Sequence, residues 1–237
     1  MAETIFIPRR FNGPPDSANG GYTCGAVAGL LQAQLAEVSL RAPPPLEIPL
    51  EVEREEDQVR LLHGDTLVAE GRPVELELEP PEPIDPDLAD EAARAGYERW
   101  SSRHPFPTCV ICGPEREPGD GYRVFPGPVA SADLFAASWT PDPSLAGSDG
   151  LVRGECVWGA LDCPTSAPVA NFGEGPPVVL ARLTASVERP VRAGRAHSLV
   201  SWPIDVDGRK RHAGVALFDS DGGLLARARA LWIELRR

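Results

Sequence analysis

Apolar residues recur at helical spacing from Gly21 onward, which predicts the first long helix of the chain. They are Val27, Leu30, Leu31, Leu35 and Val38. A second stripe of the same helix consists of the small residues Gly25, Gly29 and Ala33. Because these residues have almost no side chain, this face of the helix can lie very close to another backbone.

The beginning of this helix has features of an anion-binding site. Asn19 is a good N-cap residue, and Gly20 and Gly21 leave the first backbone N–H groups of the helix accessible. Such a helix start attracts an oxyanion or a phosphate. The alternative is a buried helix with a flexible beginning and no ligand.

The rest of the first half has the pattern of strands. Residues 4–8 form a short apolar strand, and apolar and polar residues alternate over 46–53, where Pro49 indicates an edge or a bulge. Residues 59–62 and 67–78 flank a His-Gly-Asp turn and predict a hairpin.

A second set of elements follows a proline- and acid-rich run over residues 79–87. One helix is predicted from the N-cap Asp85 to Trp100, and another over residues 152–163. Strands are predicted over 134–139, 181–188, 197–204, 211–218 and 224–235.

Each half thus contains a strand, an apolar helix and a run of antiparallel strands. The hairpin over residues 59–78 aligns with residues 215–235 with one gap, and leucine, alanine and arginine recur at matching positions. The pattern predicts an internal duplication.

Composition narrows the class of protein. The chain has 237 residues, 42% of them hydrophobic, and a net charge of −12. No apolar run approaches the roughly 20 residues of a membrane span, and the acidic balance argues against nucleic acid or an anionic membrane as a partner. Residues 1–4 lack a basic region and an apolar signal core, and the five cysteines are an odd number. We therefore expect a cytoplasmic protein with reduced thiols.

Three segments carry a resemblance to a known family. They are Asn19-Gly20-Gly21 with the helix that follows, residues 158–162, and residues 188–194. With the repeated order of strand, helix and sheet, they resemble the type II acyl-CoA thioesterases of the double-hotdog, thioesterase-like superfamily. The resemblance implies an α+β fold, a double hotdog in which two helix-wrapped antiparallel sheets form one pseudo-dimeric unit. Residues 1–80 and 134–237 are then the two halves, and residues 81–133 form a linker with a short helix and a Cys-Xaa-Xaa-Cys loop.

The resemblance also implies a catalytic site. Asp162 stands where the family carries a catalytic aspartate and would act as general base on the water that attacks a thioester carbonyl. Asn19, Gly20 and Gly21 would hold the oxyanion. The alternatives are a helix cap at Asn19 and, at Asp162, an aspartate bonded to turn backbone.

Type II thioesterases add a glutamine and a threonine that orient the water. Thr184 is the nearest threonine candidate in this chain. Ala230 stands where the glutamine is expected, so the catalytic set is incomplete.

The implied ligand is a small-molecule acyl thioester, with coenzyme A as part of the substrate and no separate cofactor. Tyr22 would line the pocket, and the basic residues Arg209, Lys210 and Arg211 would attract the phosphates of coenzyme A. The alternative for Tyr22 is an ordinary residue of the first helical turn, and the alternative for the basic residues is a solvated arm of a hairpin. Two hotdogs in one chain mimic the usual hotdog dimer, so we expect a monomer or a homodimer.

Cys109 and Cys112 have the spacing of half a zinc site or of a redox pair. The further donors in the sequence are His104, Cys156, Cys163 and Cys24. No second pair has matching spacing, so the sequence favours packed loop thiols, and we expect no metal site.

Two functions from different classes remain open. One is thioester hydrolysis with Asp162 as base, and the other is non-catalytic binding of an acyl ligand, which Ala230 favours. A dehydratase ranks third, because that chemistry needs a histidine paired with a carboxylate and none of the four histidines lies in either central helix. The sequence contains no Gly-Xaa-Ser-Xaa-Gly elbow and no phosphate-binding Gly-Lys-Ser/Thr loop.

Overall fold

A computed structural model describes residues 3–129, 133–170 and 177–235 of the chain. Its strands are β1 (Thr4–Phe6), β2 (Leu35–Leu40), β3 (Pro49–Glu55), β4 (Gln58–His63), β5 (Thr66–Pro73), β6 (Gly127–Pro128), β7 (Phe135–Trp139), β8 (Val178–Val187), β9 (His197–Asp207), β10 (Lys210–Asp219) and β11 (Leu224–Glu234). Its helices are α1 (Gly20–Leu31), α2 (Pro86–Trp100) and α3 (Gly154–Ala170), with short 3-10 turns η1 (Arg9–Phe11) and η2 (Pro143–Leu145).

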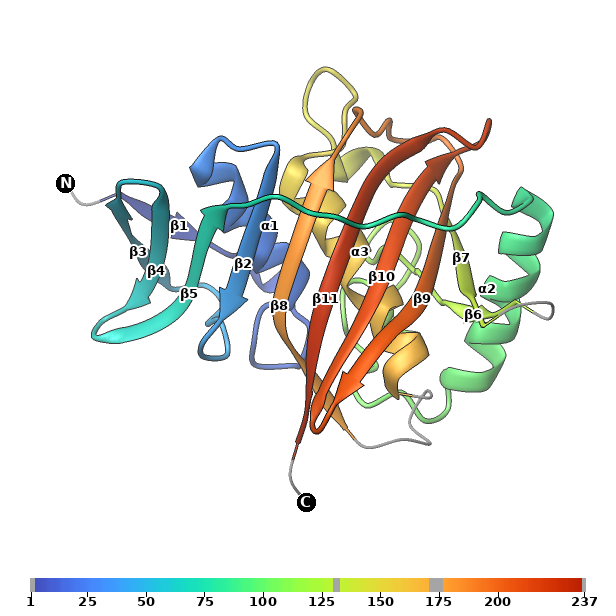
Figure 1. Cartoon of the computed structure of the whole chain (residues 1–237), viewed down its shortest axis with the longest axis horizontal. Helices are drawn as coiled ribbons and strands as arrows, with labels where there is room; N and C mark the ends of the chain where they lie inside the picture. Colours follow the sequence, from blue (N-terminus) through green and yellow to red (C-terminus); the bar gives the residue numbers. More distant parts are fainter. Residues whose placement is uncertain (1–2, 130–132, 171–176, 236–237) are drawn as a thin grey trace.

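The strands form one continuous antiparallel sheet, and α1 and α3 lie side by side against one of its faces (Figure 1). The strand order is β1-β3-β4-β5-β2-β8-β11-β10-β9-β7-β6. Read from its outer edge toward the junction, the first half has the order β1-β3-β4-β5-β2 and the second has the order β7-β9-β10-β11-β8. In both halves the first strand is therefore followed by the third, fourth, fifth and second. The two halves meet where β2 pairs with β8, and β6 extends the far edge. The predicted duplication and the expected α+β architecture are therefore present.

The strand register places a local two-fold axis at the junction of the halves. The equivalent pairs in the two halves are Ala69 with Leu40 and Ala226 with Val187. Superposing these pairs brings Glu37 onto Thr184, and Glu37 and Thr184 are also partners across β2 and β8. The axis therefore passes between these two residues.

Two glycines of α1 allow the central helices to approach closely. A Cβ added at Gly21 would lie 2.4 Å from Cβ of Asp162, and one at Gly25 would lie 2.6 Å from Cα of Glu155. Gly29 faces open space, and Ala33 lies beyond the end of the helix. The small-residue contact that we predicted is real, but it runs through Gly21 and Gly25.

The prediction that the first helix extends past Leu31 is wrong. Gln32 adopts a left-handed conformation with φ of 54° and ends α1. Leu35 and Val38 belong to β2 instead, where Val38 points into the core. Both residues fit a helical spacing, so the apolar pattern alone did not mark the end of the helix.

The second central helix is longer than predicted and continues through Pro164 and Pro168. Pro168 has no N–H to donate to the carbonyl oxygen of Pro164. The hydroxyl of Ser201 in β9 donates to that oxygen at 2.8 Å instead. A tertiary hydrogen bond therefore satisfies the group that the proline leaves unpaired.

The segment between the halves is attached to both sides of the sheet. Residues 74–85 cross the face opposite to α1 and α3, and α2 packs beside β7 and β6 (Figure 1). Arg227 donates to the carbonyl oxygen of Leu78, and Ile84 packs on an apolar cluster of β9 and β10. Val110 and Ile111 are fully buried in the main core, so this part of the expected linker is an integral part of the fold. Residues 130–132 at its end lie outside the described residues.

Candidate active site

Asp162 connects the two central helices. It lies on α3, is 3% exposed, and its Oδ2 accepts hydrogen bonds from Nδ2 of Asn19 and from the backbone N–H of Gly21, both at 2.9 Å. Its Oδ1 is buried and has no partner in the described part of the chain. The carboxylate is thus held by one oxygen, and the other is available to a further donor.

Asn19 positions Asp162 and caps α1 with the same amide group. Its Oδ1 accepts the backbone N–H of Tyr22, while its Nδ2 donates to Asp162. The two interpretations of Asn19 from the sequence, a helix cap and a site residue, are therefore compatible. The structure brings Asp162, Asn19 and Gly21 together from opposite halves of the chain.

Burial raises the pKa of Asp162 to about 7. The Gly21 N–H acts in the opposite direction, the neighbouring Cys109 adds to the increase, and the amide of Asn19 opposes it. A carboxyl group with such a pKa can both take up and release a proton near neutral pH.

The start of α1 has fewer free donors than the sequence suggested. The N–H of Gly21 is bound to Asp162, that of Tyr22 to the side chain of Asn19, and that of Thr23 to the carbonyl oxygen of Asn19. Gly20 is the first residue of α1, and its N–H has no hydrogen-bond acceptor among the described residues. The side chains of Leu40 and Leu180 are the nearest to the space beside Gly20.

Thr184 is not brought to Asp162. Its neighbours Leu183 and Ala185 point into the core, so Thr184 lies on the sheet face opposite to α3. Its hydroxyl lies 3.4 Å from Oε2 of Glu37. Ala230, by contrast, is fully buried and pairs with Leu183 in β8.

Thr165 is a threonine that bonds to Asp162 itself, and sequence reasoning missed it. Its hydroxyl donates to the carbonyl oxygen of Asp162 at 2.6 Å and accepts Nε1–H of Trp232 at 2.8 Å. A threonine three residues after Asp162 on a helix often bonds back in this way, which was a usable signal. The contact with Trp232 depends on the packing of β11 and was not readable from local sequence.

Tyr22 and the basic run contact other parts of the molecule. The Tyr22 ring is 7% exposed and stacks on Phe11 with ring centroids 4.0 Å apart. Arg211 pairs with Glu234 at 2.6 Å, and Lys210 with Asp207 at 3.6 Å. Arg209 donates to the carbonyl oxygen of Glu234. These cations lie at the β9–β10 turn, and their contacts are with acidic residues and carbonyl groups of neighbouring strands.

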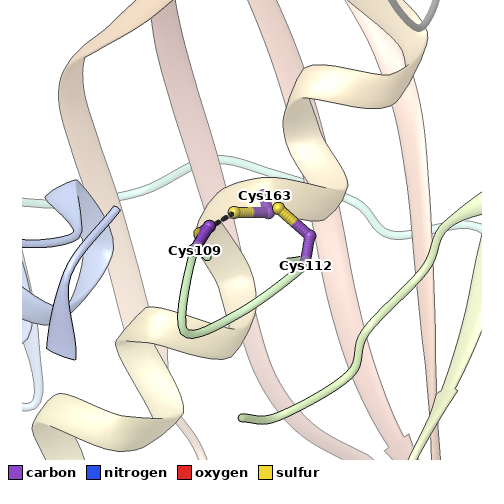
Figure 2. Close-up of side chains that lie close together, drawn as sticks. All are labelled: Cys109, Cys112 and Cys163. Carbon is purple, nitrogen blue, oxygen red and sulfur yellow. Dashed lines mark hydrogen bonds between the residues drawn. The ribbon is translucent and has the colours of Figure 1, made fainter. Parts of the chain in front are cut away.

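A cluster of three thiols adjoins the site. Cys109 and Cys112 lie on a loop that faces α3, and Cys163, the residue after Asp162, completes the group (Figure 2). The three Sγ atoms lie within 4.8 Å of one another. A separate open cavity of about 650 Å³ lies against α2 and is lined in part by Tyr97, Arg123 and Phe125; it does not include Asp162.

Solved structures with the same arrangement define the fold. A structure from Novosphingobium aromaticivorans assigned as a thioesterase matches 98% of this chain and 95% of its own, with a TM-score of 0.62 and 12% identity. The tesB protein of Mycobacterium avium subs paratuberculosis matches 92% of this chain and 88% of its own, with a TM-score of 0.60 and 13% identity. The fold is a double hotdog.

An acyl-CoA thioesterase II from Mycobacterium marinum shares this double hotdog, with a TM-score of 0.55 and 13% identity over 93% of this chain and 92% of its own. No family profile and no curated protein sequence matches the chain. At these identities the likeness establishes the double-hotdog fold, which the sequence predicted, and it leaves the reaction to be argued from the site. Among the described helices, none is long and apolar enough to cross a membrane.

Proposed function

We propose that this double hotdog is a thioesterase-like hydrolase that cleaves an acyl thioester, with acyl-CoA as the substrate and Asp162 as the base. One observation carries the proposal. A buried carboxylate at the start of α1 is held through Oδ2 by Asn19 and Gly21, while Oδ1 has no partner among the described residues. The thioesterase assignments of structures with the same fold support this class of reaction.

The mechanism assigns one role to each group. Oδ1 of Asp162 accepts a proton from water as the water oxygen attacks the thioester carbonyl carbon. The N–H of Gly20 donates to the oxygen that becomes negatively charged. When the intermediate collapses, the carbon–sulfur bond breaks and the proton on Asp162 passes to the leaving thiolate. The products are a carboxylic acid and free coenzyme A.

Asn19 and Gly21 act as positioning residues in this scheme. Their hydrogen bonds to Oδ2 fix the rotamer of Asp162, so that Oδ1 is the atom that meets the water. Leu40 and Leu180, which lie closest to Gly20, supply apolar contacts for the acyl chain near the carbonyl group.

A non-catalytic acyl-CoA or acyl-ligand binding protein is the second candidate. Two observations favour it: Ala230 stands where the family places a glutamine, and the Gly21 N–H is already bound to Asp162. Such a protein would bind the acyl chain without orienting a water molecule.

Hydrolysis of a panel of short, long and aromatic acyl-CoA esters would distinguish the two functions. Free coenzyme A should be quantified by chromatography, so that the five free cysteines of the chain do not contribute to the signal of a thiol dye. The parent should be compared with Asp162→Asn and with Asp16→Asn, which makes the same chemical change at an exposed position.

Loss of a general base costs about 10²- to 10⁴-fold in rate, so turnover should fall by that factor in Asp162→Asn and stay unchanged in Asp16→Asn. Full turnover by Asp162→Asn would remove Asp162 from the mechanism. If the parent hydrolyses none of the esters and an acyl-CoA still raises its melting temperature, the binding function replaces the catalytic one.

A further inference from the structure

The three clustered thiols are arranged as ligands of a tetrahedral metal ion. Sγ of Cys109 and Sγ of Cys163 lie 3.8 Å apart, and all three sulfur atoms of the group fall within 4.8 Å of one another. A zinc ion bound to thiolates at about 2.3 Å in tetrahedral geometry places the sulfur atoms roughly 3.8 Å apart. The spacing therefore fits zinc without a large rearrangement of the backbone.

A fourth donor lies beside the thiols. Nε2 of His104 is 3.3 Å from Sγ of Cys112, close to the separation of two ligands on one zinc ion. His104 does not belong to the group whose atoms all lie within 4.8 Å of one another, so its ring must move toward the other two thiols to complete the site. Three cysteines and one histidine form one of the common sets for structural zinc. We propose that Cys109, Cys112, Cys163 and His104 bind one zinc ion, a metal site that the sequence alone did not lead us to expect.

The histidine must change its hydrogen bonding to become a ligand. In the present geometry Nδ1 of His104 accepts the backbone N–H of Phe106 at 3.0 Å, which leaves the proton on Nε2. Metal binding at Nε2 moves that proton to Nδ1 and requires the Phe106 N–H to find another acceptor. The three thiols release their protons, so one zinc ion replaces three protons, and the site of one Zn²⁺, three thiolates and a neutral histidine carries a net charge of −1.

Burial explains why a metal ion belongs at this place. Cys109, Cys112 and Cys163 are at most 9% exposed, and adjacent thiolates in an apolar interior need a cation to offset their charge. The ion would fasten the loop that carries Cys109 and Cys112 to α3 at the residue that follows Asp162 (Figure 2). It would thereby fix the position of Asp162 along α3 relative to Asn19 and Gly21 at the start of α1.

Metal content of the full chain tests the proposal independently of any acyl-CoA activity. The protein should be purified under reducing conditions without chelators, passed through gel filtration and analysed by mass spectrometry for zinc. Cys112→Ser and Cys163→Ser are the test variants. Cys24→Ser and Cys156→Ser are matched controls, because both residues are fully buried free cysteines that do not belong to the cluster.

We expect one zinc ion per chain in the parent and in both controls, and its loss in both test variants. Stoichiometric zinc in Cys112→Ser and Cys163→Ser would overturn the site. A parent that carries no zinc after reduction and incubation with zinc would overturn it as well. A Cys109–Cys163 disulfide in such a zinc-free parent would then identify the cluster as a redox pair.

Cobalt binding to the parent keeps the proposal testable if the variants do not fold. Under anaerobic conditions, Co²⁺ should produce the intense visible bands of tetrahedral thiolate coordination and release about three protons. Weak octahedral bands alone would overturn the proposal. His104→Gln should lose zinc faster to a chelator than the parent does, and an unchanged rate would remove His104 from the ligand set.

Discussion

Asn19 uses both ends of one amide group, an acceptor oxygen and a donor nitrogen, which an aspartate cap cannot do. The oxygen caps α1 and the nitrogen holds Asp162 from the other half of the chain. Serine, threonine and aspartate offer an acceptor for the helix, but aspartate has no proton for the carboxylate. Asn19 is thus matched to two partners, the backbone of Tyr22 three residues away and the side chain of Asp162 in the other half of the chain.

Substitutions of Asn19 should separate these two tasks. Asn19→Ala removes the cap and one partner of Asp162, and should lower the free energy of unfolding by about 1–3 kcal/mol. Asn19→Asp keeps the cap acceptor but places a second buried carboxyl group against Asp162, so it should destabilise more than Asn19→Ala.

Urea denaturation of each variant measures these changes. Asp85→Ala is the control, because Asp85 caps α2 at an exposed position and has no contact with Asp162. Asp85→Ala should lower the free energy of unfolding by about 1 kcal/mol, the usual cost of losing a helix cap. An Asn19→Asp variant as stable as the parent would show that the amide nitrogen contributes nothing to the fold.

At the scale of single residues, the sequence was informative about some groups of the site. Asp162, Asn19 and Gly21 were predicted and lie together. Thr184 was named as the nearest threonine to the position that the family resemblance implies, yet alternation turns its side chain to the opposite face of the sheet. Which face a strand residue occupies depends on register, and register is set by partners that the local pattern does not show.

At the scale of elements, the close contact of α1 and α3 determines which helical positions tolerate a side chain. A Cβ added at Gly21 or Gly25 would overlap atoms of α3, whereas Gly29 is exposed and a Cβ added there would meet nothing within 4 Å. Glycine in a helix is otherwise unfavourable, so its presence at the contact reflects packing.

Gly21→Ala and Gly29→Ala should therefore change stability in opposite directions. The new methyl group at Gly21 would overlap Asp162, and we expect a loss of about 1–3 kcal/mol even though alanine favours the helix. Gly29→Ala should gain about 0.5–1 kcal/mol through helix propensity alone. Thermal or urea unfolding of both variants checks this, and equal gains would show that the helices are not in contact at Gly21.

The limits of the elements were harder to predict than their order. Leu35 and Val38 continue the helical spacing of the first helix, so only the left-handed turn at Gln32 separates α1 from β2. The second helix was expected to end at Cys163, just before Pro164, yet it continues to Ala170, and the Ser201 hydroxyl of β9 satisfies the carbonyl oxygen that Pro168 leaves unpaired. In the second case the interaction comes from a residue far outside the helix.

At the scale of the whole molecule, one sheet joins both halves through β2 and β8. The central helices also contact each other across the same junction. The sequence order of strand, apolar helix and antiparallel strands in each half was predictable from the apolar pattern, although β2 was taken as part of the first helix. The pairing of β2 with β8 was not predictable, because the two strands are far apart in sequence.

This continuity predicts that the two halves unfold together. All five tryptophans, at positions 100, 139, 158, 202 and 232, lie outside the first half. Leu61 is fully buried in β4 of the first half. Leu61→Ala should lower the free energy of unfolding by about 2–5 kcal/mol, and tryptophan fluorescence should report the full shift.

Far-UV circular dichroism on the same samples provides the comparison, since it reports secondary structure in both halves. The two transitions should coincide in the parent and in the variant. A fluorescence midpoint that stays unchanged while the dichroism curve divides into two steps would show that the halves are independent domains.

The axis between Glu37 and Thr184 has a consequence for how the protein can specialise. In a hotdog made from two identical chains, every substitution occurs twice, and any residue on the axis must face its own copy. Here a carboxylate faces a hydroxyl on the axis, and the Asn-Gly-Gly helix start meets an aspartate on the other helix. Joining the repeats in one chain thus frees each half to carry a different part of a single asymmetric site.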